Sequence, residues 1–183
     1  MSFSRPLLLL IVLIPAASLH AMAQGRNEIA FSLGAGSLQT NPGGGATAVF
    51  SVSYQFHITG HFSAEGALDT FFYKFMTGPP DSPYGYKDDY LGAEAAVVYH
   101  FRDINKTGRW QPFVVAGIGK TTTDFTEIAA HPYYRLGVGV TYHLSDRLGF
   151  RLEVRDEIIK SLWIQGNPDG NLPSIRCGVF YRF

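Results

Sequence analysis

Acidic and basic side chains recur at every second position in several segments of this chain. Arg151, Glu153 and Arg155 alternate with apolar residues in one segment, and Glu65 and Asp69 share a parity in another. Residues two apart lie on the same face of a β-strand. Carboxylates and guanidinium groups gathered on such faces can form ion pairs, line a path for ions, or act in acid–base catalysis. The charged residues that we assign to this face are Glu65, Asp69, Glu94, Arg135, Arg151, Glu153, Arg155 and Arg176.

A histidine and a hydroxyl group also lie two residues apart, at His61 and Ser63. An imidazole beside a serine hydroxyl is the pair that serine hydrolases use to form a nucleophile. This pair directly follows the turn signal Thr59-Gly60, so we interpret both residues as turn-flanking. We therefore expect no catalytic residue, and the protein is not predicted to be an enzyme.

No group of residues has the spacing of a metal or cofactor site. The histidines are scattered, Cys177 is the single cysteine, and the acidic residues of the Gly- and Pro-rich segments lack the spacing of a calcium loop. We expect no metal ion, no cofactor and no disulfide. The net charge is zero, so the chain has no basic footprint that would indicate binding to nucleic acid.

Alternation of apolar with small or polar residues predicts eight β-strands, and no helix beyond the N-terminal segment. Turn-rich segments separate the strands, and those after the first, third, fifth and seventh strands are mostly longer than the other three. Residues 41–45, 74–89 and 166–170 are predicted loops of the longer kind. The predicted strands cover residues 28–36, 46–58, 62–73, 90–101, 110–119, 133–144, 148–158 and 174–183.

The two faces of these strands differ in composition. One face carries bulky apolar residues, such as Phe50 and Val52, whereas the other is mostly glycine, alanine and serine besides the charged set. A soluble lipocalin-type barrel would turn the apolar face inward, but the interior of an eight-stranded barrel is too narrow for that volume. The sequence therefore predicts an all-β fold, an eight-stranded antiparallel up-and-down transmembrane β-barrel. Aromatic residues near the short-turn ends would form a girdle at the membrane interface: Tyr54, Phe56, Tyr99, Phe101, Tyr142 and Tyr181.

On this interpretation the charged set faces the lumen, and we call its eight members the lumen charges. In a narrow space of low dielectric constant they must pair or contact water. We expect a salt-bridge network that plugs the lumen and fixes the register of the strands, with a path for ions or small solutes as the alternative. We predict that Arg151, Glu153 and Arg176 interact with Glu65 and Glu94 across the barrel in one charge network. His57, His100 and His143 share this parity, nearer the short-turn end.

The N-terminus has the features of a secretory signal peptide. Arg5 supplies a positive charge, residues 7–14 form a short apolar run, and Ala21-Met22-Ala23 is a small-x-small cleavage site. We therefore divide the chain into a signal peptide, residues 1–23, and a barrel domain, residues 24–183. The apolar run is too short for a transmembrane helix.

The last predicted strand ends on an aromatic residue. Its apolar positions are Ile175, Cys177, Val179, Tyr181 and Phe183. A closed barrel pairs its last strand with its first and so leaves no free edge. This pattern resembles the C-terminal signature of bacterial outer-membrane barrels, and the resemblance implies that these five residues are the signal that the barrel-assembly machinery recognises.

With the strand at residues 112–119 and the asymmetry of the connections, the chain resembles the small OmpA/OmpX-like outer-membrane β-barrel family, as a barrel-only member. The resemblance implies an integral outer-membrane protein, monomeric, in contact with outer-membrane lipids and lipopolysaccharide. Its expected role is structural, in envelope integrity, or in adhesion. A narrow channel is one alternative. A lipid A-modifying barrel enzyme is another, because a His-x-Ser pair is part of lipid A deacylase barrels.

Overall fold

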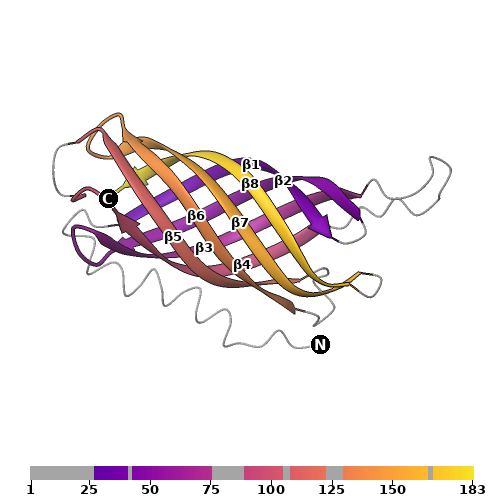
Figure 1. The fold of residues 1–183 in the computed structure, drawn as a ribbon. Coiled ribbons are helices and arrows are strands. Elements are labelled where there is room, and N and C mark those ends of the chain that lie inside the picture. Colours follow the sequence, from indigo (N-terminus) through magenta and orange to yellow (C-terminus); the bar gives the residue numbers. More distant parts are fainter. Residues whose placement is uncertain (1–26, 41–42, 76–88, 105–107, 123–129, 165–166) are drawn as a thin grey trace, which may run out of the picture.

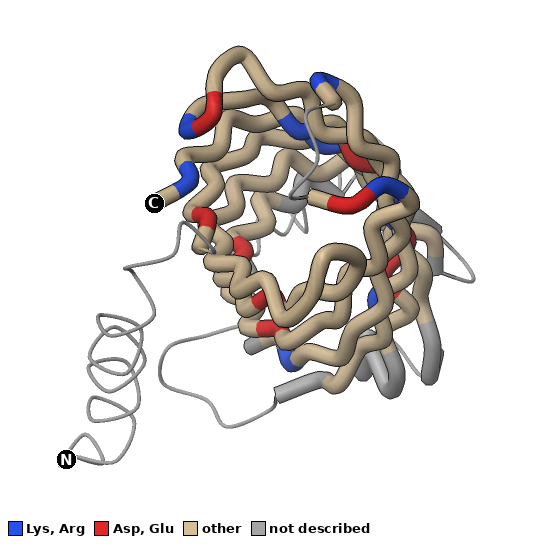
Figure 2. The backbone as a smooth tube through the Cα atoms, turned by 90° about the vertical axis from the view of Figure 1, so that its left-hand side faces the viewer, with Lys and Arg blue, Asp and Glu red and all other residues tan. Residues whose placement is uncertain are grey.

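The protein is a closed β-barrel. The computed structural model describes residues 27–40, 43–75, 89–104, 108–122, 130–164 and 167–183. Each strand pairs antiparallel with its neighbours in sequence, and the last pairs with the first (Figure 1). Seen from one end, the backbone forms a closed ring (Figure 2). The strands are β1 (Asn27–Thr40), β2 (Gly43–His57), β3 (Phe62–Phe75), β4 (Asp89–His100), β5 (Trp110–Thr122), β6 (Ala130–His143), β7 (Leu148–Ile164) and β8 (Asn167–Arg182). The predicted eight-stranded antiparallel barrel is confirmed.

The seam between β1 and β8 closes the sheet. Phe31 pairs with Val179, and this register continues along both strands. At the end of the seam, the Phe183 amide donates to the Asn27 carbonyl at 2.9 Å, and the Asn27 amide donates to the Phe183 carbonyl at 3.3 Å. The barrel therefore has no unpaired edge along this seam, which is the condition under which a β-sheet can lie in lipid.

Tight turns close hairpins at the end where the C-terminus lies (Figure 1), which we call the short-turn end. Between β2 and β3, the Ile58 amide donates to the Phe62 carbonyl at 2.8 Å, and the Thr59 hydroxyl accepts from the Phe62 amide at 3.0 Å. Between β6 and β7, the Leu144 amide donates to the Leu148 carbonyl at 2.9 Å. The predicted turn at Thr59-Gly60 is thus present.

At the opposite end the strands are longer than predicted. Residues 43–45 and 167–170 lie in β2 and β8, so the predicted loops at 41–45 and 166–170 are wrong over these positions. Between β1 and β2 only residues 41–42 lie outside the strands, and between β7 and β8 only residues 165–166. The reason is that two hairpins continue past the closed part of the ladder: residues 43–44 pair with β1 alone, and residues 167–170 with β7 alone. Pairing with one neighbouring strand is enough to hold these glycine- and proline-containing segments in extended backbone despite their low β propensity.

The outer face is apolar and exposed. Leu33 and Ile118 are 64% and 63% exposed, and such side chains cover all eight strands. The six residues of the predicted girdle lie at the short-turn end, and their rings contact further aromatics, for example Trp110 against Tyr142 at 4.6 Å between centroids. Exposed apolar surface on this scale is expected only where it meets lipid or another apolar partner.

The described part of the chain contains no helix long and apolar enough to cross a membrane.

The inner face uses glycine to admit aromatic rings. A Cβ atom at Gly119 would lie 2.3 Å from Cζ of Tyr133, and one at Gly139 would lie 2.4 Å from Cζ of Phe113. Both rings are buried inside the barrel. The small residues that the sequence places on this face therefore make room for a few large side chains, which fill a lumen of limited width.

Candidate functional site: the charged lumen

All eight lumen charges are buried inside the barrel, none of them more than 9% exposed. They project from β3, β4, β6, β7 and β8, and the alternation of each strand aims them inward. Ion pairs connect all eight, directly or through a shared partner. The charges that sequence parity collects are therefore one group in space.

Arg135 is the centre of this group and is completely buried. It donates to Glu65 at 2.8 Å, to Glu153 at 2.7 Å, and to Glu94. These partners lie on three different strands, β3, β4 and β7. Hydrogen bonds between ionised groups are stronger than neutral ones, so this single side chain ties β6 across the lumen to β3 and β4, with which β6 shares no ladder.

Arg151 extends the group toward the short-turn end. It donates to Glu65 at 2.5 Å and lies 2.9 Å from Glu153. Its guanidinium carbon lies 4.5 Å above the centre of the Phe113 ring. The ring thus caps the network on this side with a favourable cation–π contact.

Arg155 and Arg176 extend the group toward the other end. Arg155 contacts Glu153 at 2.8 Å and Glu94 at 3.2 Å, and Arg176 donates to Asp69 at 2.8 Å. Among the described side chains no ion pair joins Arg176 directly to Glu65 or Glu94, and it enters the network through other carboxylates instead. The shear of the barrel brings it beside a different pair of carboxylates.

The partner that explains this is Glu157, which sequence reasoning missed. It is 1% exposed, accepts from Arg176 and lies 3.5 Å from Arg155. Its parity on β7 is that of Arg151, Glu153 and Arg155. The alternation in the predicted strand at residues 148–158 therefore already indicated that Glu157 faces the lumen. With Glu157, the described network contains five carboxylates and four guanidinium groups, an excess of one formal negative charge.

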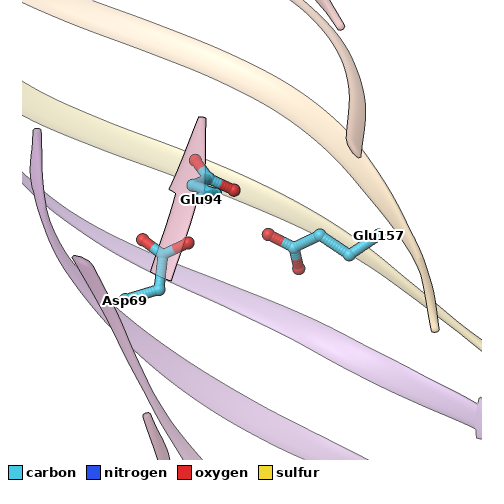
Figure 3. A group of neighbouring side chains, drawn as sticks. All are labelled: Asp69, Glu94 and Glu157. Carbon is cyan, nitrogen blue, oxygen red and sulfur yellow. The ribbon is translucent and has the colours of Figure 1, made fainter. Parts of the chain in front are cut away.

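Three carboxylates of the network converge. Oxygens of Asp69, Glu94 and Glu157 lie within 4.8 Å of one another (Figure 3). This is the place in the described residues where acidic side chains could hold a cation. Each of the three also contacts a guanidinium group, which already supplies positive charge. The grouping therefore follows from pairing with arginine, and the absence of a metal remains a prediction.

Tyr133 was also missed, although its parity matches that of Arg135 on β6. It is buried, and its hydroxyl donates to Glu94 at 3.0 Å. Phe71 lies on the same side of the network, with the guanidinium carbon of Arg176 5.7 Å from its ring centre. Aromatic side chains thus bound the network at both ends.

A second polar cluster, the histidine layer, lies between the network and the short-turn end. His57 is hydrogen-bonded through Nδ1 to the Ser63 hydroxyl at 2.6 Å and through Nε2 to Glu28 at 2.9 Å. His100 lies 3.1 Å from the same hydroxyl and 2.9 Å from the Gln55 amide. Gln55 in turn accepts from Arg151 at 3.3 Å, so the two clusters form one continuous set of contacts.

His61 and Ser63 do not form a pair. His61 is exposed in the turn, and its Nδ1–H donates to the His100 carbonyl at 2.8 Å. The interpretation of His61 as turn-flanking therefore holds, whereas Ser63 faces the lumen and is fully buried.

The order Ser63, His57, Glu28 resembles the nucleophile, base and acid of a hydrolase. Sequence reasoning missed this chain of contacts because Glu28 lies at the start of β1, far from the other two in sequence. The Ser63 hydroxyl lies between two imidazoles and has no exposed surface on which a substrate could dock. The arrangement can therefore hold the short-turn end together, but it offers no open nucleophile.

The residues of the expected assembly signal lie on the outer face of β8. Ile175, Val179 and Tyr181 are 53%, 43% and 43% exposed, and Cys177 is a free, exposed cysteine. Phe183 stacks on Tyr181 with ring centroids 6.3 Å apart. Their recognition during assembly remains a prediction.

Comparisons with known proteins agree with this architecture. A family model described as an outer membrane protein beta-barrel domain matches residues 7–183. Comparison with curated protein sequences gave no match.

Several solved structures share the fold. The Neisserial surface protein A has a TM-score of 0.63 at 16% identity, over 87% of this chain and 98% of that one. OprG from Pseudomonas aeruginosa has a TM-score of 0.56 at 11% identity, over 86% and 96%. The outer membrane enzyme PagL has a TM-score of 0.55 at 18% identity, over 81% and 97%. At such identities the likeness concerns the fold alone.

Proposed function

The chain belongs to the outer membrane protein beta-barrel family, and on this premise we propose that it is a structural barrel with a plugged lumen. Its role is then in envelope integrity or adhesion, exerted from its surface rather than by transport. The end where the C-terminus lies faces the periplasm, and the opposite end, which carries the longest connection, between β3 and β4, faces outward, as in up-and-down barrels of this kind. Residues 1–23, which lie outside the described residues, serve as the signal peptide that directs the chain to this location.

The observation that carries the proposal is the set of buried ion pairs that crosses the lumen, together with the small space beside them. The cavity beside Arg151, Arg155 and Arg176 has a volume of about 10 Å³, which is room for about one water molecule. A hydrated ion needs a wider path, and the ion pairs that border the cavity would have to separate before one could pass.

Conductance across a planar bilayer tests the plug. The wild-type barrel in potassium chloride should give no regular current steps. The double variant Glu65→Ala/Arg151→Ala removes two paired charges of opposite sign and should open a small conductance. Asp146→Asn, in the exposed turn between β6 and β7, is the matched control and should stay closed. Regular, ion-selective steps from the wild type would establish a channel instead.

A barrel enzyme is the alternative that the likeness to PagL raises, because that protein is an enzyme with this fold. The buried position of Ser63 argues against it. Mass spectra of lipid A from cells that express the wild type or Ser63→Ala should be identical. Loss of an acyl chain that depends on Ser63 would make the protein a hydrolase.

We also propose its surroundings. Outer-membrane lipids and lipopolysaccharide contact the apolar outer face, and the barrel-assembly machinery engages β8 through the outward residues that end at Phe183. The protein acts as a monomer, without a cofactor or a nucleic-acid partner.

A further inference from the structure

Asp156 interrupts the apolar outer face. Its neighbours across the ladders are Leu136 on β6 and Pro173 on β8. Counted from the short-turn end, the first six outward residues of β7 are Leu148, Phe150, Leu152, Val154, Asp156 and Ile158. We call the apolar part of the outer face the apolar belt. Among its described side chains Asp156 is the one carboxylate, and apolar residues flank it on every side.

This carboxylate has an oxygen without a partner. Asp156 is partly buried between its neighbours, and its Oδ1 is shielded yet makes no hydrogen bond within the described part of the protein. A charged group on the lipid-facing surface of a barrel is destabilising. Ionisable residues inside a membrane commonly mark functional positions. A ligand that donates hydrogen bonds to Asp156 would remove this cost.

An apolar groove ends at this carboxylate. The groove has a volume of about 640 Å³, and its lining runs from Val97 and Tyr99 on β4 to Asp156 and Pro173. It follows one row of paired residues across five strands: Val97, Ala116, Leu136, Asp156 and Pro173.

The row rises across the membrane. Val97 is the second outward residue from the short-turn end of β4, whereas Asp156 is the fifth on β7. Strands of a membrane barrel are tilted by about 35–45°, so a row along the hydrogen bonds is oblique as well. The groove therefore descends from Asp156, in the outer half of the belt, toward the aromatic girdle at Tyr99.

We propose that this groove binds one acyl chain of an outer-leaflet lipid A molecule, and that Asp156 accepts hydrogen bonds from amide N–H or hydroxyl groups near the top of that chain. An ionised carboxylate is an acceptor only. Ester-linked phospholipids present carbonyl acceptors at this depth and cannot satisfy it. Amide-linked, hydroxylated acyl chains offer the donors it needs. The inference rests on the proposed orientation and lipid surroundings, but not on the plugged lumen.

Lipid retention by native mass spectrometry tests the chemistry. The full mature protein is placed in bilayers of equal amounts of sphingomyelin and phosphatidylcholine, which share a headgroup. Sphingomyelin has an amide and a hydroxyl group below this headgroup, whereas phosphatidylcholine has two ester groups there. Because hydrogen bonds to charged groups are the stronger ones, the wild type should retain sphingomyelin about ten-fold over phosphatidylcholine. Lipid A, set against cardiolipin, should show the same preference.

Asp156→Leu should fold, because it removes a charge from a lipid-facing surface, and should lose both preferences. The control Asp146→Leu removes the same charge at the exposed turn and should keep them. Ala116→Phe fills the groove and should lower retention of lipid A while Asp156 is intact.

Equal retention of the two lipids of each pair by the wild type would overturn the inference. If Asp156→Leu keeps the preference, lipopolysaccharide stays a proposed partner, but Asp156 is not the residue that binds it and the proposed site is wrong. A preference for sphingomyelin without one for lipid A would exclude lipid A as the occupant.

Discussion

Arg135 on β6 and Glu65 on β3 meet across the lumen at 2.8 Å, although they lie 70 residues apart in sequence and their strands are not neighbours. The barrel ladder alone connects these strands only indirectly, through β4 and β5 on one side and through β7, β8, β1 and β2 on the other. This pair therefore adds a tie across the interior that does not depend on backbone hydrogen bonds, and the stability of the barrel should depend on it.

Glu65→Gln should destabilise the barrel strongly. The substitution weakens the contacts with both Arg135 and Arg151 and leaves their positive charge undercompensated in a buried site. Removing one partner of a buried pair typically costs about 3–5 kcal/mol. Urea unfolding from lipid vesicles should therefore show a much lower midpoint than for the wild type. Asp146→Asn is the control; equal midpoints for the two variants would mean that the lumen is open and its charges are solvated.

Glu157→Gln should be milder than Glu65→Gln. Glu157 lies within 4.8 Å of two other carboxylates, so its neutralisation relieves a repulsion that Glu65, which is outside this group, does not experience there. The repulsion relieved offsets part of the loss of the ion pair with Arg176. The same urea experiment ranks the two variants, and a larger loss for Glu157→Gln would show that the three carboxylates do not repel one another in the folded barrel.

Gly119→Ala should disturb the network without changing any charge. The added methyl group would overlap the Tyr133 ring, which would have to move away from Glu94. Overpacking of this kind costs about 1–3 kcal/mol. Gly66→Ala is the matched control, because a Cβ at Gly66 faces outward and meets only one atom, at 3.9 Å. If the reason is steric, the additional substitution Tyr133→Leu should restore part of the stability of Gly119→Ala.

Tyr181→Asp and deletion of Phe183 should both reduce the amount of folded barrel in outer membranes. Tyr181 is exposed on the lipid-facing side, and an acidic residue there costs on the order of 1 kcal/mol or more, depending on depth. Asn171→Asp, on the same face of β8 but beyond the apolar belt, should assemble normally. Folded protein is measured as the heat-modifiable band on a gel, and wild-type amounts of Tyr181→Asp would contradict the assembly signal.

The mature protein should begin at Gln24 and sediment with outer membranes. Its unheated form should migrate faster on a gel than its boiled form, because a closed ladder resists unfolding by detergent. Mass spectrometry of the purified protein gives the N-terminus. Recovery as a soluble periplasmic protein without this shift would contradict the predicted location, and an N-terminus other than Gln24 would contradict the predicted cleavage site.

Alternation was enough to predict the strands, their number and the inward direction of each lumen charge. It could not give the pairs, because the vertical position of a residue depends on the shear of the barrel, which no local pattern encodes. Arg151 reaches Glu65 as the predicted contacts require, whereas Arg176 binds Asp69 and Glu157 instead. Four residues were overlooked for two reasons. Three lie near the ends of predicted strands, where alternation is least reliable: Glu28, Tyr133 and Glu157. Asp156 lies on the outer face, where only apolar residues were expected.

The seam between β1 and β8 brings the start and the end of the barrel's polypeptide chain together, because Asn27 and Phe183 are hydrogen-bonded to each other. A covalent link there would make the backbone a continuous loop, and new ends could then be opened in the exposed turn at residues 145–147 without breaking a ladder. Such a circular permutant would keep every strand neighbour of the native barrel but would no longer end on β8. It would thus separate the information that specifies the fold from the information that delivers the chain to the membrane.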